Sequence, residues 1–145
     1  MFIFLDIDGV LVPARSWEKP VLLSDAFPTF SINAVQALRS LIKENTQIIL
    51  TTSHRFRFTI QEWKSIFRNR GVEVVSIEKL PESDSYNTNR KEDILRWLAQ
   101  RPSIDNYIIL DDDKSLNDLP SEVKNKLILT QSTVGLTEAD VSSFL

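Results

Sequence analysis

Short, continuous apolar segments recur along the chain, and helical patterns separate them. The apolar segments are Phe2–Leu5, Gln47–Leu50, Val72–Ile77, Tyr107–Leu110 and Leu127–Leu129. Runs of this length are typical of strands that are buried on both faces of a sheet. No hairpin signal joins most neighbouring segments, so the connections are expected to cross over and the strands to run parallel. The pattern therefore predicts an α/β fold with a mainly parallel sheet of about five strands.

Helix signals lie between the predicted strands. Ser31 is a candidate N-cap for a helix that extends to about Glu44, and Thr59 is a candidate cap for a helix to about Asn69. Arg90–Arg101 and a short segment from Thr137 complete the set. Residues 10–30 contain three prolines and are predicted to be mostly loop or hairpin, and residues 80–89 are polar and are predicted to be a loop. The result is a three-layer, doubly wound (Rossmann-like) domain, and the length fits one domain over residues 1–145.

Composition excludes several classes of site. The chain has no cysteine, so neither disulfides nor thiolate metal sites are available, and a metal ion would need oxygen ligands or the single histidine, His54. The apolar segments are too short to span a bilayer, and the first residues lack the basic flank of a signal peptide. We therefore expect a cytoplasmic protein that has no membrane partner.

Charged and hydroxyl side chains follow the predicted strands. Asp6 and Asp8 come after the first strand, Thr51–Arg55 after the second, and Asp111–Asp113 after the fourth, while Arg90 and Lys91 begin a helix. Ligands of parallel α/β sheets bind outside the carboxyl ends of the strands. These groups are therefore predicted to converge on one edge of the sheet.

The converging groups suit phosphoryl chemistry. Aspartate oxygens are hard ligands that fit Mg²⁺, and clustered carboxylates repel one another unless a cation lies among them. Hydroxyl and cationic groups bind the spread charge of a phosphoryl group, and a carboxylate such as Asp6 can attack its phosphorus. Asp8 lies on the same side of the extended chain and could exchange protons with the leaving group and with water. Gly9 allows a sharp turn close to the metal site.

These residues resemble the haloacid-dehalogenase-like (HAD) phosphatase superfamily. Its first motif, Asp-x-Asp-Gly after an apolar strand, is matched by Phe2–Val10, and its Thr after the next strand by Thr52. Its later basic residue is matched by Lys91 or Arg90, and its acidic pair by Asp111 and Asp112. The motifs occur in the family's order and span nearly the whole chain.

The resemblance implies a role for each matched residue. Asp6 would be the nucleophile, Asp8 the general acid and base, Thr52 a phosphoryl ligand and Lys91 the favoured site cation, with Arg90 as the alternative. Mg²⁺ would be held by Asp6, by Asp8 through its carbonyl, and by Asp112 with Asp111 beside it. Further substrate-binding candidates are Thr51, Ser53, His54, Arg55 and Arg90.

A closer resemblance is to the HAD domains associated with "Swiss Army Knife" RNA repair proteins. It rests on residues 90–98, 108–113 and 127–130, and above all on Val134–Thr137. The gaps between the motifs are too short for the cap domain of larger family members. A site without a cap is open to water and suits a phosphate at the end of a polymer. The substrate expected is a nucleic-acid terminal phosphate or a nucleotide.

Other interpretations stay open at this point. A phosphatase of phosphoproteins or small metabolites is one, and a non-catalytic module that binds a phosphorylated ligand or a partner is another. The basic residues of segment 55–70 could face phosphate or could line a solvated helix. Trp17, Phe56 and Phe58 lie near arginines and could stack on bases or could pack in the core. Oligomeric state, and whether residues 10–30 form a moving flap, are not fixed by the sequence.

Overall fold

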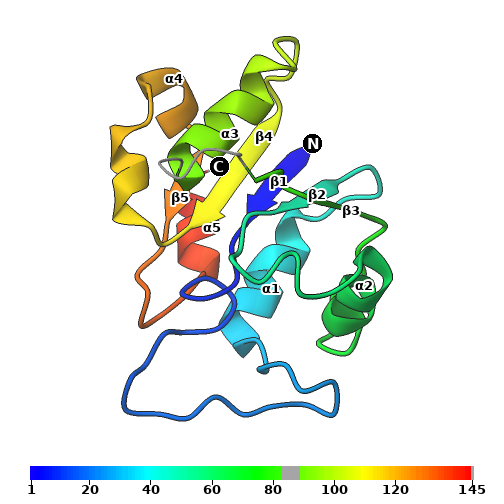
Figure 1. The fold of residues 1–145 in the computed structure, drawn as a ribbon. Coiled ribbons are helices and arrows are strands. Elements are labelled where there is room, and N and C mark those ends of the chain that lie inside the picture. Colours follow the sequence, from blue (N-terminus) through cyan, green and yellow to red (C-terminus); the bar gives the residue numbers. More distant parts are fainter. Residues whose placement is uncertain (83–88, 145) are drawn as a thin grey trace.

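The computed structural model describes residues 1–82 and 89–144. Its sheet has five parallel strands in the order β3-β2-β1-β4-β5 (Figure 1). The strands are β1 (Phe2–Leu5), β2 (Gln47–Leu50), β3 (Ser76–Lys79), β4 (Tyr107–Asp111) and β5 (Leu127–Leu129). The strand order reverses beside β1, which pairs with β2 on one side and β4 on the other. The predicted α/β class with a parallel, doubly wound sheet is confirmed.

Six helices accompany the sheet in the described residues. They are α1 (Ile32–Leu41), α2 (Ile60–Arg68), α3 (Arg90–Ala99), the 3₁₀ helix η1 (Lys114–Asp118), α4 (Ser121–Lys124) and α5 (Glu138–Phe144). Both predicted caps are confirmed: Ser31 Oγ accepts from the Ala34 amide at 3.1 Å, and Thr59 forms a capping box with Glu62. The η1 and α4 helices were not predicted, because four or five residues are too few to give a helical period.

The helices cover both faces of the sheet, which gives the predicted three layers (Figure 1). On one face, alternate strand residues such as Ile3 and Leu5 pack against α1, α2 and α5. On the other face, Phe4, Ile49 and Ile109 pack against α3 and the η1 segment. Burial on both faces explains why the central strand β1 is apolar at every position.

The third strand was predicted in the wrong place. Val72–Ile77 is apolar enough for a strand, but β3 begins at Ser76 and extends to Lys79. Val72 and Val74 are buried in the core while lying in the connection after α2. Burial of a connecting segment produces the same apolar signal as a strand, and the pairing of Ser76 with Gln47 sets the observed register.

Residues 13–30, called the long loop below, connect β1 to α1, as predicted for residues 10–30. An isolated antiparallel bridge joins Leu22 to Pro28, and the Ala14 amide donates to the Ser132 carbonyl at 2.7 Å. The buried Arg70 guanidinium binds both carboxylate oxygens of Asp25, at 2.6 and 2.8 Å. The loop is therefore fixed near both ends.

Two other expectations concern loops and membranes. The loop predicted over residues 80–89 lies largely outside the described residues. Of the helices in residues 1–82 and 89–144, none is long and apolar enough to cross a membrane.

Candidate active site

The pairing of β1 with β4 places the first and last acidic motifs side by side. Leu5 is in register with Leu110, so Asp6 and Asp111 leave the sheet as neighbours. One carboxylate oxygen each from Asp6, Asp111 and Asp112 lies within 4.8 Å of the other two. Oxygen donors at this spacing are the set that a hard divalent cation such as Mg²⁺ prefers. The three predicted acidic metal ligands are thus brought together.

Burial makes the carboxylates of Asp6 and Asp111 costly to ionise. Burial, followed by the charge of Asp111, raises the pKa of Asp6 to about 8. Burial also raises the pKa of Asp111, although Arg90 opposes the shift. A cation among these oxygens would favour their charged forms, so the donor set fits a bound metal ion in charge as well as in chemistry.

The cation that contacts the cluster is Arg90. Its guanidinium lies 3.1 Å from Asp6 Oδ2 and 2.9 Å from Asp111 Oδ1. Burial alone would lower the pKa of Arg90, but the carboxylates of Asp111 and Asp6 outweigh it and raise that pKa. Lys91, which the sequence favoured as the site cation, is half-buried on the next position of α3. The described ion pairs of Asp6 and Asp111 are made with Arg90.

Gly9 allows Asp112 to approach the cluster. Its φ is +80°, and a Cβ built on it would lie only 2.0 Å from Asp112 Oδ2. The Ser132 hydroxyl donates to the same carboxylate oxygen at 2.8 Å, and the Thr130 hydroxyl donates to the Gly9 carbonyl at 2.7 Å. Thr130 and Ser132 were not predicted as site residues. Their position just after β5, at the same edge of the sheet, is the signal that could have found them.

The end of β2 brings hydroxyls and the single histidine to the site. Thr51 and Thr52 are both buried, and within the described part of the chain Thr51 Oγ1 is a buried polar atom that has no hydrogen-bond partner. The His54 amide donates to Thr52 Oγ1 at 3.2 Å. His54 Nε2 lies 2.9 Å from Asp8 Oδ2, and the Asp8 side chain is 55% exposed. His54 therefore contacts the predicted general acid and base, an interaction across 46 residues that the sequence did not indicate.

Arg55, a predicted substrate ligand, instead supports the loop after β2. Its guanidinium is buried and donates to the carbonyls of Leu80 and Thr52, at 2.6 and 3.0 Å. These bonds direct the guanidinium toward backbone oxygens and give it a structural role, while its role in substrate binding stays a prediction. Ser53, from the same predicted set, is exposed at the strand end.

The basic segment 55–70 is not a single phosphate-facing patch. Arg55 and Arg70 are buried and bonded to carbonyls or to Asp25, and Arg68 pairs with Glu73 at 3.2 Å. The aromatic candidates also divide. Phe58 packs on Phe27 and Trp63, which is the core interpretation, whereas Trp17 and Phe56 are 69% and 51% exposed.

Comparison with known protein families supports the assignment of the motifs to the HAD superfamily. The family described as "HAD domain in Swiss Army Knife RNA repair proteins" matches residues 2–141. No curated protein and no solved structure matches the chain. The match covers almost the whole sequence, including all the strand ends described above, and supports a HAD-type phosphatase function in general terms. The chain therefore belongs to the family of HAD domains found in Swiss Army Knife RNA repair proteins.

Proposed function

We propose that the protein is a Mg²⁺-dependent phosphomonoester hydrolase in which Asp6 is the nucleophile. The observation that carries the proposal is the position of Asp6, buried at the end of the central strand and within 4.8 Å of the Asp111 and Asp112 carboxylates. A bound Mg²⁺ would be held by these three side chains and the Asp8 carbonyl, and would supply positive charge to the phosphoryl oxygens.

The reaction has two steps. A carboxylate oxygen of Asp6 attacks phosphorus, the bond from phosphorus to the leaving-group oxygen breaks, and Asp8 gives that oxygen a proton. Asp8 then takes a proton from water as the water oxygen attacks the phosphorus of the aspartyl-phosphate. The bond to the Asp6 oxygen breaks, and inorganic phosphate and the Asp6 carboxylate are released.

Side chains around Asp6 supply the remaining contacts. Arg90 is placed to stabilise negative charge on Asp6 and on the phosphoryl group, since its guanidinium lies 3.1 Å from Asp6 Oδ2. Thr52 is the proposed hydroxyl ligand of the phosphoryl oxygens, and the unpartnered Thr51 Oγ1 offers a second donor in the same strand end. Lys91 remains the alternative cation on the same first turn of α3.

The favoured substrate is a terminal phosphate of a nucleic acid or a nucleotide. Two observations support it: the family to which the chain belongs consists of domains found in RNA repair proteins, and Trp17 on the long loop is exposed. Exposed aromatic side chains stack readily on unpaired bases. A phosphatase of phosphoproteins or small metabolites, and a binding module without activity, are the alternatives that the experiment must separate.

The test is phosphate release from a panel of phosphate esters, with Mg²⁺ or with a chelator. The panel contains oligonucleotides with 3′- or 5′-phosphates, nucleotides, a phosphopeptide and an aryl phosphate. We expect Mg²⁺-dependent release that falls by at least about 10³-fold in Asp6→Asn, because the attacking oxygen is removed. The same activity in Asp6→Asn would contradict the mechanism, and preference for the phosphopeptide would favour the alternative substrate class.

A further inference from the structure

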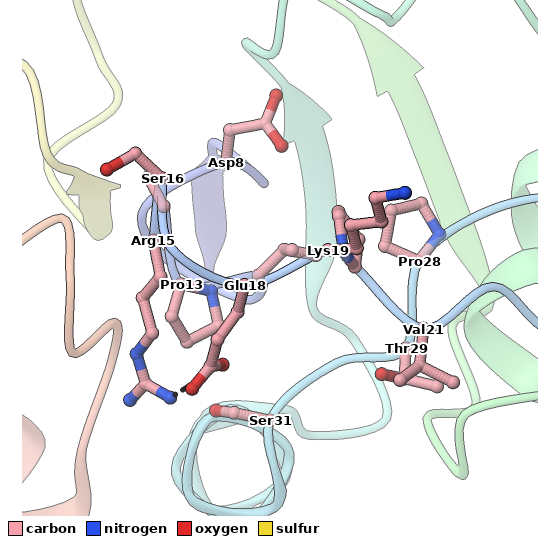
Figure 2. Close-up of a pocket in the computed structure, with 13 residues that line it drawn as sticks. Asp8, Pro13, Arg15, Ser16, Glu18, Lys19, Val21, Pro28, Thr29 and Ser31 are labelled. Atoms are coloured by element: carbon pink, nitrogen blue, oxygen red, sulfur yellow. Dashed lines mark hydrogen bonds and ion pairs between the residues drawn. The ribbon is translucent and has the colours of Figure 1, made fainter.

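A pocket of about 610 Å³ lies within the long loop, and Asp8 forms part of its wall (Figure 2). The remaining wall comes from the outgoing part of the chain, residues 12–21, and from the returning part, residues 28–31. The volume is in the range of sites that bind small organic molecules. Asp8 is thus a residue of the proposed reaction that lines this pocket.

The position of Asp8 indicates which part of a substrate would enter. In the proposed reaction Asp8 protonates the leaving-group oxygen, so its carboxylate must come within hydrogen-bond distance of that oxygen. The rest of the leaving group must then occupy space next to Asp8. The pocket inside the long loop supplies such space, whereas the phosphoryl group itself belongs at Asp6.

The pocket wall combines flat apolar surfaces with a few polar groups. Val12, Pro13 and Pro28 provide apolar surface to the lining, and Ser16 and Thr29 each add a hydroxyl group to it. Sites of this composition bind ring systems through the apolar surface and orient them through the polar groups. A nucleoside, which joins a flat base to a hydroxylated sugar, has matching chemistry.

The charged residues that line the pocket are Asp8, Arg15, Glu18 and Lys19. Arg15 pairs with Glu18 at 3.5 Å and donates to the Thr133 carbonyl at 2.9 Å, so its charge is already compensated. Lys19 takes part in none of the ion pairs found in residues 1–82 and 89–144. Figure 2 shows the Lys19 side chain extending away from the Arg15–Glu18 pair. An ammonium group in this position can bind a phosphodiester.

We propose that this pocket binds the leaving group of the substrate, and that the leaving group is the terminal nucleoside of a nucleic-acid strand with Lys19 against the next phosphodiester. The inference rests on the proposed phosphatase function. It deepens that function, because it assigns substrate selection to residues of the long loop and requires at least one phosphodiester beyond the scissile phosphate.

The first test compares two substrates that differ by one phosphodiester. They are a dinucleotide with a terminal phosphate and the corresponding mononucleotide. We expect Lys19→Gln to reduce the ratio of their kcat/KM values by about fivefold, the effect of losing one solvent-facing charged contact. The matched control is Lys124→Gln on α4, an exposed lysine outside the pocket, which leaves the ratio unchanged.

A second variant fills the pocket without touching Asp8. Ala14 is exposed and lines the pocket, and its amide donates to the Ser132 carbonyl, so Ala14→Phe adds a ring at the pocket wall and keeps the backbone bond. We expect the KM of the dinucleotide to rise by about tenfold relative to the inhibition constant of inorganic phosphate. Phosphate occupies only the site at Asp6 and therefore serves as the internal reference.

The possible outcomes separate a failure of the pocket assignment from a failure of the proposed phosphatase function. An unchanged substrate ratio in Lys19→Gln together with an unchanged KM in Ala14→Phe would overturn the assignment of the pocket. Mg²⁺-dependent hydrolysis of the aryl phosphate, lost in Asp6→Asn, alongside inert nucleotides would overturn the pocket and leave the phosphatase function intact. If no substrate is hydrolysed and calorimetry detects no dinucleotide binding to Asp6→Asn, both the phosphatase function and the pocket assignment are overturned.

Discussion

The carboxylate cluster and the long loop hold their side chains in different ways. Asp6 directly follows β1 and Asp111 is the last residue of the neighbouring strand β4; both are buried, and they share one guanidinium. Residues 14–20 of the loop are all exposed, and the loop is fixed mainly near its ends, by Ala14 and by Asp25. The proposed chemistry therefore depends on the rigid sheet edge, whereas the proposed substrate selection depends on a segment that contributes little to the core.

The largest effect is expected when the cation is removed from the carboxylate cluster. In Arg90→Met without Mg²⁺, Asp6 and Asp111 lose their shared partner, and we expect the free energy of unfolding at pH 8 to fall by about 3 kcal/mol. Lys91→Met is the matched control, with an expected change below about 0.5 kcal/mol. Urea unfolding and phosphate release are both measured. Greater loss of activity in Lys91→Met would restore Lys91 as the site cation.

A second expected effect is a dependence of stability on pH. The pKa of Asp6 rises from 3.8 to about 8 on folding, so the folded state holds the proton more tightly than the unfolded state. Stability of the metal-free protein is therefore highest below about pH 4 for this group and is lost as the pH rises toward 8. Unfolding in chelator at several pH values checks this, and Asp6→Asn is expected to flatten the slope. Equal slopes in both proteins would show that Asp6 is not responsible.

A substitution at Gly9 tests how closely the carboxylate cluster is packed. Gly9→Ala places a methyl group on Asp112, and we expect Mg²⁺ affinity to fall by about 10- to 100-fold in titration calorimetry. Gly71→Ala is the control, because Gly71 has a similar φ of +82° but no atom within 4 Å of an added Cβ. Gly71→Ala therefore introduces the backbone strain of a positive φ without a steric clash. Equal losses of affinity in both variants would assign the effect to general instability.

His54 joins the two regions, since it contacts Asp8 and stacks edge-on with Phe27 of the long loop. We expect His54→Ala to lower kcat by about tenfold for alkyl phosphates, whose leaving groups need protonation, and by less for aryl phosphates. His54→Gln keeps a hydrogen-bonding nitrogen and is expected to restore part of the loss. The same reduction for every leaving group would show that His54 does not act through Asp8.

The smallest effect is expected in the exposed part of the loop. Trp17→Ala is predicted to change the free energy of unfolding by less than about 0.5 kcal/mol, because the side chain is 69% exposed. Phe27→Ala, in the buried part of the same loop, is expected to cost about 3 kcal/mol. Thermal and urea unfolding of the two variants provide the measurement. A similar cost for both would contradict the contrast between the two parts of the loop.

The sheet and its acidic edge could be predicted because both follow from local patterns. Continuous apolar runs marked the strands, and Asp6 and Asp111 come directly after or at the end of two of them. The third strand was misplaced because Val72 and Val74 are buried without being paired. Local composition reports burial, while strand boundaries depend on a partner far away in the sequence.

The choice between Arg90 and Lys91 depends on helix phase. Neighbouring residues on a helix differ by about 100° in direction, so only one of them can face Asp6. The cap at Asn89 and the packing of Ile94 and Trp97 set that phase, and neither is visible in a motif. The buried role of Arg55 was missed for a similar reason, since its carbonyl partner Leu80 lies 25 residues away.

The attachment of the long loop at Ala14 and Asp25 has a consequence for how the chain can be altered. Both attachments, and the bridge between Leu22 and Pro28, lie outside residues 16–20, so a change in the length of that stretch leaves these contacts in place. The entropy cost of a longer loop grows slowly, by about 0.6 kcal/mol for each doubling of its length. Residues 16–20 are therefore a stretch in which insertions or grafted sequences could alter substrate selection without a change at the carboxylate cluster.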